Sequence, residues 1–167
     1  NGYAGMSNLA ALVAVDQAEA GFTGLDEGVA RHLGLAAAGD VDTAALSAGL
    51  GECWELAHGY YKIHAACRFT HPVLDVLTDL NGRVDPADVE SVTVEKDSAA
   101  ARLDETNPEN SLQAKFSIPF AVATTLLTGE TAPASFEDDA IAPEARVLAE
   151  RVDIAVDDEF AARAPDQ

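Results

Sequence analysis

The sequence predicts an α+β fold in which a small sheet packs with helices. Almost half of the 167 residues (48%) are apolar, which is enough to bury a core. Residues 89–96 and 152–156 alternate apolar and polar side chains, as half-buried strands do. Helical patterns lie around them without a regular strand–helix–strand period, and this irregular order favours α+β.

The chain opens with two predicted helices. Residues 4–20 place leucine and valine among many alanines, and Gly21 is suited to end that helix. A turn at 21–24 leads into a second helical pattern over 25–33.

A loop-rich stretch follows the two helices. Residues 34–51 are rich in Gly, Ala and Asp, which predicts a linker with a short helical turn near 43–47. Residues 53–64 carry aromatic side chains without a helical period, which indicates an extended or irregular segment.

The remaining helices are marked by prolines and glycines. Pro72 fits the first position of a helix capped by Thr70 or His71 and broken by Asn81-Gly82. The apolar stretch 116–127, with Pro119 in its first turn and Gly129 after it, predicts a buried helix. One or two short helices are expected over 136–150.

Charge and cysteine content limit the partners. The chain has 29 acidic and 10 basic residues and a net charge of −19, so nucleic acid and anionic membranes are unsuitable partners. Acidic residues spread along the whole chain resemble the surface of a protein from a salt-loving organism. Two cysteines provide neither a disulfide framework nor a structural metal site, and they fit a cytoplasmic protein.

Residues 62–71 carry the candidate chemistry. They bring Lys62, Cys67, Arg68 and His71 together just before a predicted helix, in a chain with three lysines. Two interpretations stay open at this point: a cationic pocket for an anionic substrate, or a polar loop-to-helix junction. His58 and His64 have weaker claims and are not included among the candidates.

Three motifs occur in an informative order. They are the turn Gly21-Phe22-Thr23-Gly24, the run from Lys62 to Cys67-Arg68-Phe69-Thr70-His71-Pro72, and Ala114-Lys115-Phe116-Ser117-Ile118-Pro119-Phe120. Together they resemble the C-terminal portion of the MmgE/PrpD family, which includes 2-methylcitrate dehydratase, an enzyme of propionate catabolism, and cis-aconitate decarboxylase.

The resemblance implies an architecture. Residues 1–24 would belong to an all-helical domain, 25–51 would form a linker with short helices, and 52–167 would form an α+β lid. The site would lie between the two domains of a homodimeric enzyme that needs no metal or organic cofactor. Because the chain begins with Asn1 rather than Met, we expect a piece of a longer protein that is inactive by itself.

The resemblance also implies residue roles. Lys62 would bind a substrate carboxylate, and His71 would act in proton transfer or binding. Cys67 falls where some relatives carry a catalytic histidine, and it is either a weak proton donor or a packed residue. Arg68 would hold a carboxylate of the substrate or of its own protein.

The second motif adds three candidate substrate-binding residues. Lys115 and Ser117 precede the apolar helix and would either bind an anion or serve the helix start. Phe120 falls where many relatives have tyrosine, so any role of that hydroxyl would be lost here.

The expected function is therefore that of a lyase lid acting on a small di- or tricarboxylate. Loss of water or carbon dioxide would need a base, an acid and cations that hold the carboxylates. The alternatives are an epimerase or hydrolase of related acids on the same scaffold, or a non-catalytic binding or oligomerisation module.

Overall fold

The computed structural model describes residues 3–37, 39 and 41–162. The chain divides into two compact units, Asn1–Gly59 and Tyr60–Gln167. Residues 1–2, 38, 40 and 163–167, which fall within the predicted domains and linker, lie outside the described residues.

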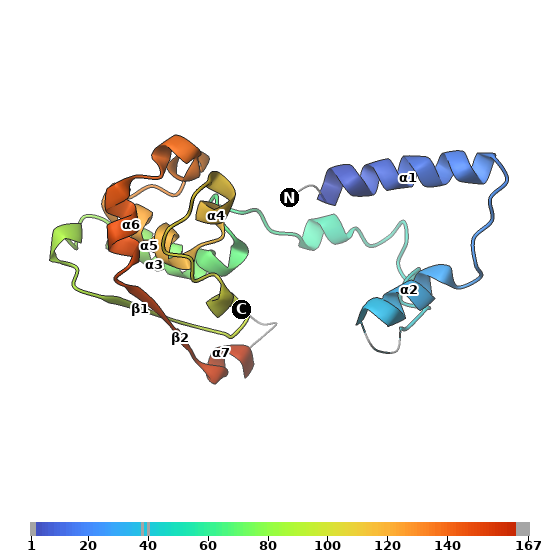
Figure 1. The fold of residues 1–167 in the computed structure, drawn as a ribbon. Coiled ribbons are helices and arrows are strands. Elements are labelled where there is room, and N and C mark those ends of the chain that lie inside the picture. The colour runs from blue at the N-terminus through green and yellow to red at the C-terminus, as the bar shows by residue number, and fades with distance from the viewer. Residues whose placement is uncertain (1–2, 38, 40, 163–167) are drawn as a thin grey trace. The chain divides into compact units, whose positions relative to one another are not determined.

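The described residues of the first unit form the α-helices α1 (Tyr3–Glu19) and α2 (Gly28–Ala37) (Figure 1). The α1 helix ends where predicted, and Gly21 follows with a positive φ of 92° that suits glycine. The second helix begins three residues later than expected, because Leu25 accepts a turn hydrogen bond from Gly28 and Glu27 adopts a positive φ of 58°. The linker contains turns, including one near Ala44–Ser47. The segment 53–64, predicted to be extended or irregular, contains a 3₁₀ turn at Glu55–His58.

The second unit confirms the predicted α+β class. The strands β1 (Val92–Lys96) and β2 (Val152–Val156) pair in parallel, with Val92 opposite Val152 and Lys96 opposite Val156. In Figure 1 the two strands lie side by side, with α3, α4, α5 and α6 gathered on one side of them and α7 at the end of β2. In β1 the side chains of Val94 and Lys96 are buried while Thr93 and Glu95 are exposed, as the alternation predicts.

The helices of this unit are α3 (His71–Leu80), α4 (Ser111–Lys115), α5 (Ile118–Thr128), α6 (Pro143–Ala149) and α7 (Asp158–Ala162). The α5 helix is the centre of the core, since every residue from Ile118 to Thr125 is buried. It packs against α3, α6 and β2. Its C-terminus is closed by Gly129, whose φ of 72° allows its N–H to bond with the Thr125 carbonyl at 2.8 Å.

The start of α3 differs from the prediction. Thr70 occupies the N-cap position, but its side chain forms no cap hydrogen bond. Its hydroxyl donates instead to the Cys67 carbonyl at 2.7 Å, which closes a preceding 3₁₀ turn at Arg68–Thr70. His71 is the first helical residue and Pro72 the second, so Thr70 stands at the predicted cap position but lacks the side-chain hydrogen bond of a cap.

Candidate functional site

Main-chain hydrogen bonds hold the segment between Lys62 and Cys67 against other parts of the second unit. The Ala65 N–H donates to the Thr131 carbonyl at 2.9 Å, and the Cys67 N–H donates to the Lys115 carbonyl at 2.7 Å. Thr131 follows the C-terminus of α5, and Lys115 ends α4. The structure therefore brings the two predicted motifs, 62–71 and 114–120, into direct contact.

Lys62 is exposed, and its ammonium folds back on the main chain of its own segment. The Nζ atom donates to the Ala66 carbonyl oxygen at 3.2 Å. Within the described ranges no carboxylate forms an ion pair with Lys62, although the chain has 29 acidic residues. The ammonium thus keeps donor capacity for an external acceptor.

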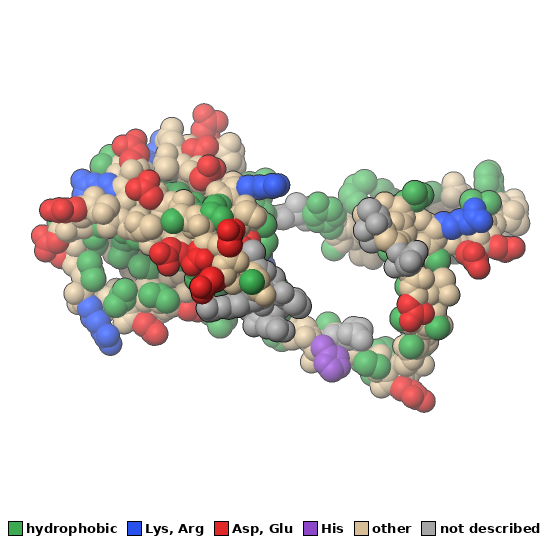
Figure 2. Space-filling view, turned by 90° about the horizontal axis from the view of Figure 1, so that it is seen from below, with side chains coloured by type: hydrophobic (Ala, Val, Ile, Leu, Met, Phe, Trp, Pro, Cys, Tyr) green, Lys and Arg blue, Asp and Glu red, His purple; other side chains and the backbone are tan. Residues whose placement is uncertain are grey.

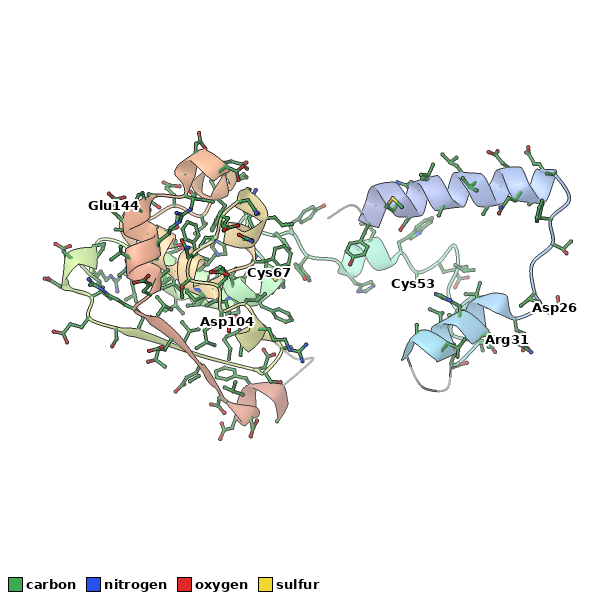
Figure 3. The ribbon with its side chains drawn as sticks, viewed as in Figure 1. Asp26, Arg31, Cys53, Cys67, Asp104 and Glu144 are labelled. Carbon is green, nitrogen blue, oxygen red and sulfur yellow. The ribbon has the colours of Figure 1, made fainter. Side chains whose placement is uncertain are left out.

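Arg68 and Cys67 have different surroundings. The Arg68 guanidinium carbon lies 4.7 Å from the centroid of the Tyr60 ring, a cation–π contact. No carboxylate among residues 3–37, 39 and 41–162 pairs with Arg68. Cys67 is half-buried with a free thiol, and Figure 3 labels it among the side chains of the second unit.

His64 was not among the residues predicted from the sequence. Its side chain nevertheless forms two hydrogen bonds and one ring contact. Its ring is 4% exposed. The Nε2 atom lies 2.8 Å from Asp75 Oδ1 on α3, and Nδ1 lies 2.7 Å from the Thr131 hydroxyl. The Thr131 partner is 67 positions away in sequence. No short motif reports such a pairing, so only the tertiary structure could reveal it.

His71 is buried next to His64. The two ring centroids are 5.1 Å apart in an edge-to-face arrangement. Burial lowers the pKa of His71 below its ordinary 6.5, opposed by a hydrogen bond with the Ala66 backbone and assisted by the charges of His64, Arg68 and Lys62. Its Nε2 atom is buried and has no hydrogen-bond partner among the residues that the structure describes. A ring that stays neutral keeps an acceptor lone pair, which suits the predicted role in proton transfer or binding.

The candidate residues of the second motif, Lys115, Ser117 and Phe120, contact other residues of the same chain. Lys115 Nζ pairs with Glu137 Oε1 at 3.0 Å. The buried Ser117 hydroxyl accepts the Phe120 N–H at 2.9 Å as the N-cap of α5, and it donates to the Glu105 carbonyl. Phe120 is 0% exposed in the core. The contacts seen for Ser117 and Phe120 are those of helix capping and packing, and their substrate-binding roles stay predictions.

A groove of about 610 Å³ lies elsewhere on the second unit and involves none of the predicted residues. It is lined mainly by apolar side chains from α5, α6 and the turn at Pro86–Asp88. Figure 3 labels Glu144, one of its lining residues, on the outer side of α6.

In the described part of the chain, no group of three or more His, Cys, Asp or Glu side chains is placed to hold a metal ion. None of the helices described there is both long and apolar enough to cross a lipid bilayer.

Comparison with known proteins identifies the family. No curated protein matches the chain. The model of the MmgE/PrpD C-terminal domain matches residues 64–167, which is more than half of the sequence. The match begins just after Lys62 and contains the other six predicted site residues. The chain therefore belongs to the MmgE/PrpD family, and its matched part is the C-terminal domain.

Proposed function

We propose that this chain supplies the carboxylate-binding lid of a lyase that acts on a small di- or tricarboxylate. The observation that supports the proposal is the exposed ammonium of Lys62, which has no carboxylate partner among the described residues. This is notable because the chain has a net charge of −19. An ammonium in a partly dry cleft binds a carboxylate more strongly than one in water. Family membership supports the lyase class at a coarse level.

The proposed reaction removes a proton next to a carboxylate and expels a leaving group from the neighbouring carbon. A base takes the C–H proton, its electron pair forms the double bond, and a hydroxyl protonated by an acid leaves as water. Alternatively, no C–H proton is removed: a carboxylate leaves as carbon dioxide, the electron pair of the broken C–C bond stays on the substrate carbon framework, and an acid supplies the proton that it takes up. Lys62 and Arg68 would hold carboxylates and stabilise the charge that develops during proton removal.

His71 would take part in proton transfer or act as a hydrogen-bond acceptor. Its lowered pKa keeps the ring neutral near pH 7, so Nε2 would offer a lone pair. A helical domain of the same protein would supply the remaining base and acid, and a homodimeric, cytoplasmic enzyme without a metal or organic cofactor is part of the same proposal.

The test uses the full-length protein with citrate, 2-methylcitrate and cis-aconitate as probes. We expect one of them to lose water or carbon dioxide, measured by product absorbance and by released carbon dioxide. Lys62→Ala should abolish turnover while the circular dichroism spectrum and melting temperature stay unchanged, because the Lys62 side chain is exposed. Near-normal turnover of Lys62→Ala would refute the assignment. Epimerisation or hydrolysis without loss of water or carbon dioxide would instead support other chemistry on the scaffold.

A further inference from the structure

His64 makes two side-chain hydrogen bonds that together fix its ring. A carboxylate can only accept, so the 2.8 Å contact with Asp75 places the proton on Nε2. In the neutral ring, Nδ1 then accepts the Thr131 hydroxyl proton at 2.7 Å. Because both ring nitrogens have partners and the ring is 4% exposed, His64 has one favoured tautomer and orientation.

This ring connects elements that are distant in sequence. Asp75 lies on α3, and Thr131 follows α5, so His64 links the 62–67 segment to both. Thr131 contributes twice, because its carbonyl also accepts the Ala65 N–H at 2.9 Å. We call these three residues, His64, Asp75 and Thr131, the clasp.

The clasp is connected to Lys62 through the carbonyl group of Ala66. Ala66 lies between Ala65 and Cys67, whose N–H groups are both bonded to other parts of the unit. The Ala66 carbonyl oxygen accepts from Lys62 Nζ at 3.2 Å. The position of this carbonyl therefore influences where the ammonium rests. His71 also hydrogen-bonds the Ala66 backbone, and the clasp is a second restraint on the same residue.

We propose that His64 is a positioning residue which, with Asp75 and Thr131, holds the Ala66 carbonyl and thereby places the Lys62 ammonium. The proposal rests on the proposed function for its effect on turnover. The placement of Lys62 is a separate matter that can be measured without activity. In this proposal His64 acts through Lys62.

The first experiment observes the ammonium directly in the full-length protein. Lysine labelled with ¹³C reports on each lysine side chain, and a Lys62→Arg variant identifies the signal from Lys62. Asp75→Asn removes the negative charge that faces His64 Nε2, at a side chain that is 63% exposed. Thr131→Val removes the hydroxyl that bonds to His64 Nδ1. We expect both to shift the Lys62 Cε signal. Asp79→Asn, an exposed residue of the same helix, is the matched control and should leave the signal unchanged.

The second experiment measures turnover of the same variants. Displacing a binding group by about 1 Å costs up to about a hundredfold in rate, so we expect kcat/KM to fall by about tenfold to a hundredfold. KM should rise because the ammonium binds the ground-state carboxylate, and kcat should fall as well because the same ammonium stabilises the charge that develops during proton removal. His64→Gln, which keeps a side-chain N–H donor, should recover part of the loss seen in His64→Leu.

The outcomes separate the two proposals. An unchanged Lys62 signal in both Asp75→Asn and Thr131→Val would overturn the positioning role, whatever the turnover. A shifted signal together with raised KM supports it. If the signal shifts but Lys62→Ala turns over normally, the positioning contact stands and the proposed function fails.

Discussion

Replacing Ser117 with alanine tests whether this residue serves the fold or a ligand. Its side chain is fully buried, and it is the N-cap of α5, the central helix of the core. The hydroxyl accepts the Phe120 N–H at 2.9 Å and donates to the Glu105 carbonyl. Alanine removes both hydrogen bonds at once.

The expected loss of stability follows from these two bonds. Losing an N-cap acceptor costs about 1 kcal/mol. Losing the second hydrogen bond, from the buried Ser117 hydroxyl to the carbonyl of the exposed Glu105, costs about another 1 kcal/mol, the usual net contribution of one hydrogen bond. We therefore expect the free energy of unfolding to fall by about 2 kcal/mol for Ser117→Ala.

The assay is urea unfolding followed by far-ultraviolet circular dichroism, with linear extrapolation to water. Asn110→Ala is the matched control, because Asn110 caps the short helix α4 at an exposed position by accepting the Gln113 N–H at 3.0 Å. It should cost only about 0.5 kcal/mol. A loss for Ser117→Ala no larger than that for Asn110→Ala would refute the argument. An unchanged stability with a raised KM would favour the anion-binding interpretation instead.

Three further predictions concern backbone conformation, pH and salt. Gly129→Ala should destabilise the protein by about 1–2 kcal/mol, measured in the same urea assay, because φ is 72° and the added methyl would meet the Asn81 side chain. Gly5→Ala, with open space and an ordinary helical position, should not destabilise it. The lowered pKa of His71 means that the unfolded chain binds more protons below pH 6.5, so stability should fall as pH falls from 6.5 toward the folded pKa. His71→Leu should lose less melting temperature than the wild type between pH 7.5 and 5.5, and an equal loss would contradict the assignment. We also propose that the net charge of −19 makes the melting temperature rise strongly from dilute buffer to molar KCl, and a flat response would contradict the halophilic interpretation.

The acidic surface that motivates the salt prediction is visible in the structure. Figure 2 shows acidic side chains spread over the displayed face of the second unit, with few basic ones among them. Glu137, which pairs with Lys115, has a side chain that is 53% exposed, so salt screens that ion pair.

The sequence determined the features that depend on neighbouring residues. Proline in the first turn and glycine after the last identified α5, because a missing N–H is harmless at a helix start and a positive φ suits glycine. Alternation of period two identified β1 and β2. The motif around Cys67 and Lys115 pointed to the family, and the domain match confirmed it.

The tertiary structure decided what depends on distant residues. Parallel pairing of β1 with β2 is set by how the intervening helices cross the core, which alternation within one strand does not encode. Thr70 has the residue type of an N-cap, but the turn before α3 brings the Cys67 carbonyl within reach of its hydroxyl. His64 meets Asp75 and Thr131 only because α3 and α5 pack together, so its importance was not apparent from the chain order.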